Sequence, residues 1–417
     1  MTSSTPDSTR PLEGLRVIDL TRALAGPYGT LLLAGLGAQV IKVEDPRGGD
    51  LARDNSPYVG RDGVVVEKRH DDDISISHLT RARGKYGVTL NLKDPGAGEV
   101  FADLVRNADI VMENFTAGTA DRLGVGYAAA RAVNPGIVYC SLSGFGADAT
   151  DGGKAMDVII QALSGAMYTS GEPGHPPVRI GVPIADMLAP VFAVIGILAA
   201  IEQRHRTGEG QHVDVSMLGA LTSFVAIENW AAMASAGMEA RTGLTVQRLS
   251  PFGVFQCADG YVAIVAVHEK LAQGLFRAMR QPELGDEPRF ATRDARVANA
   301  EMLEATINAW SRTLPTAEVV ALLEAEGVPV APVRHPEEAL VDPRVVARGE
   351  TVAVAHPSYP SEVKLRSVGV PIKFSAAHTG FDDIMPIAIG EHNASIYRDI
   401  LGYSEERIAA LHQTGTI

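Results

Sequence analysis

Strand and helix patterns alternate through the first half of the chain, and this alternation is the strongest constraint on its fold. Residues 14–20 alternate like a strand, residues 28–36 resemble a helix that ends at Gly37, and residues 38–44 form a second strand pattern. Such a β–helix–β unit joins two parallel strands through a right-handed crossover. The alternation continues over strand patterns at 88–92, 110–114, 136–142 and 212–215 and a helical pattern at 98–107. It predicts an α/β fold with a doubly wound sheet.

The later part of the chain has a different pattern. Two strand patterns in 255–267 flank Asp259-Gly260, a strong hairpin signal, and residues 268–327 are rich in helical patterns. The Gly-bearing stretch 237–251 is interpreted as a hinge, and the polar stretch 51–80 as a long surface excursion. We therefore expect four segments: a disordered tail at 1–11, a large domain made of 12–224 and 331–417, and a small domain at 225–330.

Composition narrows the functional class. The 417 residues are 46% hydrophobic and 21% charged, which is typical of a soluble globular protein. A net charge of −13 argues against a nucleic-acid binder. The longest apolar run, 187–201, is too short to span a bilayer and predicts a buried core helix, so no membrane partner is expected. Two cysteines without metal-ligand spacing and the lack of a signal peptide predict a cytoplasmic protein with no bound metal.

Asp186 is the acidic residue whose surroundings are most unusual. It lies between the Gly- and Pro-bearing segment 179–183 and the apolar run, near the start of a predicted helix. The helix dipole there favours the ionised carboxylate, whereas partial burial raises its pKa. Both effects together describe a usable nucleophile. An ordinary N-cap role remains the alternative, because aspartate is common at helix N-termini.

Two further groups of residues point to an anionic ligand. The stretch 81–85 contains three cations in an acidic chain and predicts either a solvated face or a phosphate-binding turn. Asn114 and Phe115, followed by Arg122, end a predicted strand, which is where ligands bind in open α/β sheets. Phe115 is therefore either a core side chain or a stacking partner for a base. Gly35-Leu36-Gly37 ends a helix, unlike the glycines of a dinucleotide-binding loop.

Ordered motifs along almost the whole chain resemble one family, the class III (family III) coenzyme A transferases, which include formyl-CoA transferase and carnitine CoA-transferases. The matching segments are 12–19 (LEGLRVID), 25–27 (AGP), 36–38 (LGA) with 40–44 (VIKVE), 113–115 (ENF) with 122–124 (RLG), Asp157 with 161–165 (QALSG), 185–186 (AD), 207–211 (TGEGQ), 259–261 (DGY), and 289–290 (RF) with Arg296 and Asn299.

The resemblance implies a fold, an assembly and a reaction. It implies a Rossmann-like large domain formed by both chain ends, a small domain, and a homodimer whose subunits interlock. It implies that Asp186 attacks a donor acyl-CoA to form a mixed anhydride and then an aspartyl-CoA thioester, from which CoA passes to an acceptor carboxylic acid. Coenzyme A is then a substrate and no tightly bound cofactor is required.

The resemblance also implies a CoA-binding set. Ala25, Leu90, Asn114, Phe115 and Arg122 match the family's pattern, and Arg83 and Lys85 fall in its basic turn. The family's arginine after the 40–44 strand is replaced here by Asp45, and Arg47 is its possible substitute.

Departures from the pattern bear on specificity. Leu24 stands where formyl-CoA transferase has glutamine, and its glycine-run loop has no counterpart in 237–251, so the acceptor acid is not identified. The related α-methylacyl-CoA racemases have a catalytic histidine before the aspartate that matches Asp157. Here Met156 occupies that position and cannot act as a base, which favours a transferase over a racemase. A non-catalytic CoA-binding protein is the third alternative.

Overall fold

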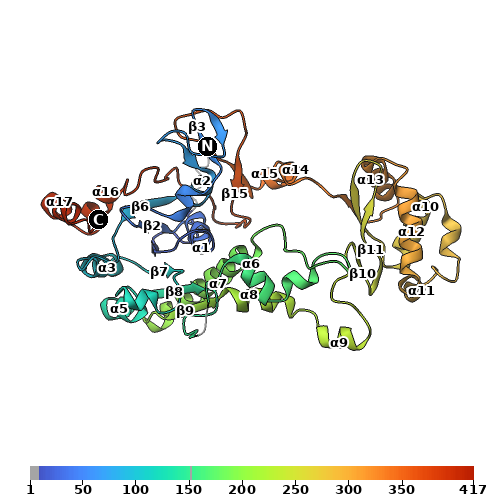
Figure 1. The fold of residues 1–417 in the computed structure, drawn as a ribbon, viewed down its shortest axis with the longest axis horizontal. Helices are drawn as coiled ribbons and strands as arrows, with labels where there is room; N and C mark the ends of the chain where they lie inside the picture. Colours follow the sequence, from blue (N-terminus) through green and yellow to red (C-terminus); the bar gives the residue numbers. More distant parts are fainter. Residues whose placement is uncertain (1–8, 151–152) are drawn as a thin grey trace, which may run out of the picture. The chain divides into compact units, whose positions relative to one another are not determined.

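The computed structural model describes residues 9–150 and 153–417 (Figure 1). It divides into two compact units. Among the described residues, the first contains 9–150, 153–164, 181–224 and 340–417, and the second contains 165–180 and 225–339. The first eight residues of the expected tail, 1–11, lie outside the described part.

The first unit is built on a six-stranded parallel sheet in the order β6-β2-β1-β7-β8-β9. When the six strands are numbered in their order along the chain, the order in the sheet is 3-2-1-4-5-6, which is the order of a doubly wound sheet. The predicted parallel α/β architecture is therefore confirmed. The strands are β1 (Arg16–Asp19), β2 (Gln39–Glu44), β6 (Lys85–Thr89), β7 (Ile110–Glu113), β8 (Val138–Ser143) and β9 (His212–Ser216).

Helices cover both faces of this sheet because its strands are apolar on both sides. On one face Phe101 of α3 and Tyr397 of α16 pack with strand residues such as Ile18 and Ile41. On the other face lie α1 and α7. The helices of this unit are α1 (Ala25–Gly35), α2 (Ile76–Arg81), α3 (Ala97–Arg106), α4 (Thr119–Arg122), α5 (Tyr127–Val133), α6 (Asp157–Leu163), α7 (Ile184–Thr207), α15 (Pro343–Ala347), α16 (Asn393–Asp399) and α17 (Glu405–Thr414).

Both ends of the chain belong to the first unit. In Figure 1 the red helices α16 and α17 lie near the blue strand β6, and α16 contacts this strand directly. The Tyr397 hydroxyl donates a hydrogen bond to the backbone carbonyl of Thr89 at the end of β6.

Helix α7 contains 24 residues, more than the apolar run 187–201 predicts. By length and composition alone it could cross a membrane. It instead packs on α1, β8 and β9 and buries small and branched side chains, among them Ala193 and Ile197. The predicted core helix is therefore confirmed.

The second unit contains the antiparallel sheet β10-β11-β12-β13 packed against helices. Phe255, Phe276 and Leu303 are at the centre of its core. The predicted hairpin is confirmed, because β11 and β12 pair on either side of the turn at 257–260. The elements are β10 (Thr245–Val246), β11 (Leu249–Gln256), β12 (Tyr261–Val265), β13 (Val330–Pro332), α9 (Trp230–Ser235), α10 (Glu269–Ala278), α11 (Arg293–Ala298), α12 (Ala300–Ser311), α13 (Thr316–Ala325), and the short turns η2 (Ala166–Thr169) and η3 (Pro282–Gly285). Two helices cross the boundary between the units, α8 (Met217–Val225) and α14 (Pro336–Leu340).

Residues 51–80 are more ordered than the term surface excursion suggests. This stretch is an ordered substructure, because three short strands bury Val59 and Ile74 against Leu79 of α2. Its polar composition concealed the few apolar side chains that make this small core. The elements are η1 (Leu51–Asp54), β3 (Tyr58–Gly60), β4 (Gly63–Val65) and β5 (Ile74–Ser75), and a separate hairpin later in the chain pairs β14 (Thr351–Ala353) with β15 (Arg366–Val368).

A buried cluster of charges lies beneath the carboxyl end of β1. Asp19, the last residue of that strand, is fully buried, and its carboxylate lies 3.1 Å from the Lys85 ammonium and 3.9 Å from that of Lys42. Lys42 also pairs with Asp50 at 2.9 Å. Burial alone would raise the pKa of Asp19, but the two lysines and two hydroxyls hold it below its usual value.

This cluster shapes the turn that follows β1. Lys42 donates to the Thr21 carbonyl, and Asp50 accepts from the backbone N–H of Ala23 at 3.0 Å. The Arg81 guanidinium donates to the Ala23 carbonyl at 2.8 Å. Ala23 consequently adopts φ of 64°, a conformation that costs a non-glycine residue free energy unless its surroundings impose it.

We predict that Lys85→Met lowers the free energy of unfolding by about 3–5 kcal/mol, because it leaves the Asp19 carboxylate buried beside one cation instead of two. Urea unfolding followed by circular dichroism measures the change. The matched control is Arg131→Gln, which removes an exposed pair with Glu209 and should cost at most about 1 kcal/mol. Equal urea midpoints for Lys85→Met and the unchanged protein would contradict the role of the cluster.

Candidate functional site

Asp186 lies in the first turn of α7, as its third residue. The N-cap position belongs to Pro183, which has no side-chain acceptor. The cap comes from another helix, because the Asp157 carboxylate of α6 accepts the backbone N–H of Ala185 at 2.8 Å. The N-cap interpretation of Asp186 is therefore wrong, and its carboxylate is left for another task.

The electrostatic surroundings of Asp186 disfavour its charge. Burial and the neighbouring Asp157 carboxylate raise the pKa of Asp186 to about 6, although Arg81 opposes the shift. Asp157 is itself held by Ala185 and by the Gln161 amide at 2.7 Å. Within 9–150 and 153–417, no hydrogen bond or ion pair of the Asp186 carboxylate is found. The site thus presents a poorly solvated, unusually basic carboxylate.

Pro190 modifies the same helix turn. It lies inside α7, four residues after Asp186, and has no N–H to donate. The carbonyl of Asp186 therefore lacks its usual i+4 donor. Helix α7 therefore lacks one backbone hydrogen bond at the residue that carries this carboxylate.

A cavity of about 490 Å³ opens beside this turn. Its lining includes Pro183, the N-cap of α7, Met187, which follows Asp186 in that helix, and Arg81 of α2. Its surface is mainly apolar, with contributions from Leu24 and Leu31. The remaining lining residues are Tyr28, Pro57, Ile76, Ser77, Thr80, Leu340, Glu350, Thr351, Arg366, Ser367 and Val368. A small organic molecule in this cavity would lie next to the first turn of α7.

The switch point of the sheet lies between β1 and β7, where ligands of doubly wound folds bind. The Asn114 amide joins the two strand ends, because it accepts the Arg22 N–H at 2.7 Å and donates to the Arg22 carbonyl at 2.9 Å. The Arg22 guanidinium lies 5.8 Å from the centre of the Phe115 ring. Ala25 begins α1 at the same edge, and Leu24 before it offers no capping side chain. Backbone N–H groups at that helix end can therefore receive an anion.

Three more expected residues follow strands at this carboxyl edge. Leu90 follows β6, is buried, and donates its N–H to the Glu44 carbonyl at 2.9 Å. Arg47 follows β2 and is exposed, but pairs with Asp45 at 3.0 Å. Arg122 follows β7 on α4 and is exposed, and its guanidinium donates only to the neighbouring Thr119 hydroxyl within the described chain.

Lys85 does not fit the expected phosphate-binding turn. It is the first residue of β6, and its ammonium is buried against Asp19, the Thr30 hydroxyl and the Pro27 carbonyl. All three of its N–H donors are thus used inside the protein. The basic run is not one turn, because Arg81 ends α2 while Lys85 begins a strand.

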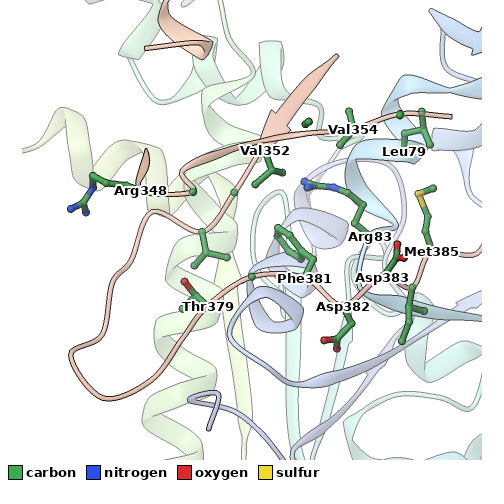
Figure 2. A pocket seen from close by; sticks show the side chains of 17 residues that line it. Leu79, Arg83, Arg348, Val352, Val354, Thr379, Phe381, Asp382, Asp383 and Met385 are labelled. Atoms are coloured by element: carbon green, nitrogen blue, oxygen red, sulfur yellow. The ribbon is translucent and has the colours of Figure 1, made fainter. Parts of the chain in front are cut away.

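Arg83 lies at the amino end of β6, opposite the edge where Leu90 and Asn114 lie. A five-residue strand separates its ends by about 16 Å. The Arg83 guanidinium donates to the Val368 carbonyl at 2.6 Å and lies 4.5 Å from the centre of the Phe381 ring. Figure 2 shows these side chains in a separate cavity of about 380 Å³. Burial lowers the pKa of Arg83 to about 10.

Several polar residues at these positions were not assigned from sequence. Arg22 and Lys93 follow β1 and β6 and are exposed at the carboxyl edge, so the strand-end rule that found Asn114 could have found them. Arg366 had no sequence signal, because it reaches the cavity from the C-terminal hairpin. Within the described ranges, no group of three or more His, Cys, Asp or Glu side chains could hold a metal ion.

Comparison with known proteins identifies close relatives. The family model described as CoA-transferase family III matches residues 12–393. The chain is 37% identical to acetyl-CoA:oxalate CoA-transferase of Acetobacter aceti, over 92% of this chain and 93% of that protein. It is also 37% identical to succinyl-CoA:mesaconate CoA-transferase of Haloarcula marismortui, over 87% and 90% of the two chains. A solved CAIB/BAIF family protein from Brucella suis superimposes with a TM-score of 0.81 at 32% identity, covering 94% of this chain and 100% of that chain.

We predict that the Asp186 carboxyl titrates with a midpoint near pH 6, because burial and Asp157 disfavour its ionised form. Carbon-13 NMR of labelled aspartate, assigned with Asp186→Asn, measures this midpoint. Asp157→Asn keeps an oxygen for the Ala185 N–H but removes the charge, so the midpoint should fall. A midpoint that does not move in Asp157→Asn would show that Asp157 has no electrostatic influence on Asp186.

The same raised pKa predicts how stability depends on pH. Asp186 has a pKa of about 6 in the folded chain against a usual 3.8, so the folded state binds more protons between these values and loses stability as pH rises through them. Asp186→Asn should therefore raise the melting temperature at pH 7.5, with the difference disappearing towards pH 3.5. Calorimetry at both pH values tests this, and a variant less stable at pH 7.5 would be the opposite result.

Proposed function

The chain belongs to CoA-transferase family III and is an enzyme that transfers CoA between an acyl-CoA and a carboxylic acid, and we propose that it does so through covalent catalysis by Asp186. The observation that supports this proposal is the position of the Asp186 carboxylate. It is basic, lacks a partner in the described chain, and is attached beside a cavity large enough for a small acid.

Each proposed step exchanges one bond for another. The Asp186 carboxylate attacks the donor carbonyl, and the C–S bond breaks. CoA thiolate is expelled, and the product on the enzyme is a mixed anhydride. The thiolate then attacks the aspartyl carbonyl and releases the donor acid, which leaves an aspartyl-CoA thioester. The acceptor carboxylate attacks this thioester and expels CoA thiolate, which finally attacks the acceptor carbonyl and regenerates Asp186. Activation of the acid is conserved throughout, so this sequence consumes no additional energy source.

Asp157 contributes to this chemistry through repulsion. Both the anhydride and the thioester convert the anionic Asp186 side chain into a neutral acyl group. Formation of either intermediate therefore removes one of two neighbouring negative charges. The repulsion raises the free energy of the resting carboxylate more than that of the intermediates, which favours acylation.

We propose that CoA binds at the carboxyl edge of a Rossmann-like sheet. Arg22, Lys93 and Arg122 supply exposed positive charge there, and Arg47 adds another cation if its pair with Asp45 opens. The Phe115 ring offers a stacking surface, and the N-terminus of α1 at Ala25 offers backbone N–H groups. Arg83 belongs to this proposal only as a more distant cation, and Lys85 only as a support for Asp19.

The acceptor is proposed to be a small carboxylic acid in the cavity beside α7. The two curated relatives named above act on oxalate and mesaconate, both dicarboxylic acids. A racemase activity is less well supported, because the side chain before Asp157 is Met156, which is 69% exposed and has no basic atom.

We further propose an interlocked homodimer in the cytoplasm. Apolar side chains that stay exposed on one chain, such as Ile195 of α7, Phe224 of α8 and Ile227, are suited to burial against a second copy. The interlocking itself rests on the family resemblance.

We predict that Asp186→Asn abolishes CoA transfer while CoA binding persists, because the amide cannot act as the nucleophile. Incubation with donor acyl-CoA and hydroxylamine, followed by peptide mass spectrometry, should place a hydroxamate on Asp186. Asp157→Asn is the comparison, since it keeps the nucleophile and should retain the adduct. Brisk exchange with an adduct elsewhere, or with none, would overturn the assignment.

A further inference from the structure

The cavity beside α7 contains more positive than negative charge. Arg81 enters it from α2 and Arg366 from β15, and neither guanidinium forms an ion pair with a carboxylate anywhere in the described chain. Glu350 is the acidic residue in its lining, and the Nε of Arg348, which lies outside the lining, already pairs with that carboxylate. Two cations in a largely apolar cavity create a demand for anionic ligand groups.

Both guanidinium groups are held in place by uncharged partners. Arg81 donates to the Ala23 carbonyl at 2.8 Å. Arg366 donates to the Thr351 carbonyl at 2.8 Å and to the Thr351 hydroxyl at 3.2 and 3.3 Å. These bonds orient each planar group and use only some of its five N–H donors. The charge remains available for a carboxylate, which a guanidinium binds through two parallel hydrogen bonds.

The two arginines are not equivalent with respect to Asp186. Arg81 is near enough to influence the Asp186 carboxylate, whereas Arg366 is not among the groups that do so. Leu24, Met187 and Val368 supply apolar surface to the same cavity. The cavity therefore has one cation on the α2 wall that acts on Asp186 and a second cation on a different wall, the β14–β15 hairpin.

We propose that Arg366 is a specificity-determining residue that binds a second carboxylate of the acceptor, so that the cavity selects short dicarboxylic acids. Arg81 then faces the carboxylate that reacts at Asp186. The proposal rests on the function proposed above, because it assumes that the acceptor occupies this cavity. Beyond that function, the proposal identifies Arg366 as the side chain that distinguishes a diacid from a monoacid of the same length.

The experiment compares acceptors that differ by one carboxylate. Succinyl-CoA is the donor, and kcat/KM is measured for glutarate and for the monoacid pentanoate with the full-length enzyme, Arg366→Gln and Arg366→Lys. Arg366→Gln should lower the glutarate value roughly 10- to 150-fold, the range for a lost hydrogen bond to a charged group, and change the pentanoate value little. Arg366→Lys should retain part of the preference, because it keeps the charge without the fork.

The ratio of the two kcat/KM values is the decisive quantity, because partial unfolding lowers both values equally. An unchanged ratio in Arg366→Gln and Arg366→Lys overturns the role of Arg366. Exchange of labelled CoA into succinyl-CoA reports the donor half-reaction separately. If the unsubstituted enzyme does not catalyse this exchange, the result contradicts the proposed function and not the role of Arg366. Arg131→Gln, an exposed substitution outside the cavity, should leave the ratio and the exchange unchanged.

Discussion

The rest of the first unit depends on the ion pairs that the buried Asp19 carboxylate forms with two lysines. Asp19 ends the central strand β1 and draws Lys85 from β6 and Lys42 from β2 beneath helix α1. Without compensation, a carboxylate in that position would be strongly destabilising. Its partners also constrain the turn at 21–24, where Ala23 is left-handed and where the switch point of the sheet begins. One buried ion cluster thus determines both the order at the sheet centre and the shape of the edge where we propose that CoA binds.

The catalytic role that we propose places an opposite demand on α7. There two carboxylates, Asp157 and Asp186, are neighbours, and only Asp157 has hydrogen-bond donors in the described chain. Asp157 stabilises the helix as a cap while it disfavours charge on Asp186. The first turn of α7 is therefore held in place by the same side chain that raises the pKa of Asp186. This combination is typical of sites where stability is reduced in favour of activity.

The sequence was sufficient for the sheet, and it singled out the aspartate that we propose as the nucleophile, because both leave local signals. Strand and helix periodicities identify β1, β2 and α1, and the Gly/Pro segment before an apolar run identifies Asp186. Interactions between distant segments were not predictable in the same way. Lys85 looked like a surface cation because its partner Asp19 is far away in sequence, and Arg366 reaches the cavity from near the C-terminus. The core around Val59 was too small to alter the polar composition of its segment.

The substructure formed by 51–81 has a consequence for how such enzymes diversify. It has its own small core, yet it contributes Pro57, Ile76, Ser77, Thr80 and Arg81 to one wall of the cavity beside α7. Its core also packs against Leu365, Met385 and Ile387 from the C-terminal part of the chain. An exchange of this wall between relatives would therefore involve both segments, while the parallel sheet could remain in place. Grafting both segments together would transfer one wall of the cavity in which we propose that the acceptor lies, so new acceptor preferences need not arise residue by residue.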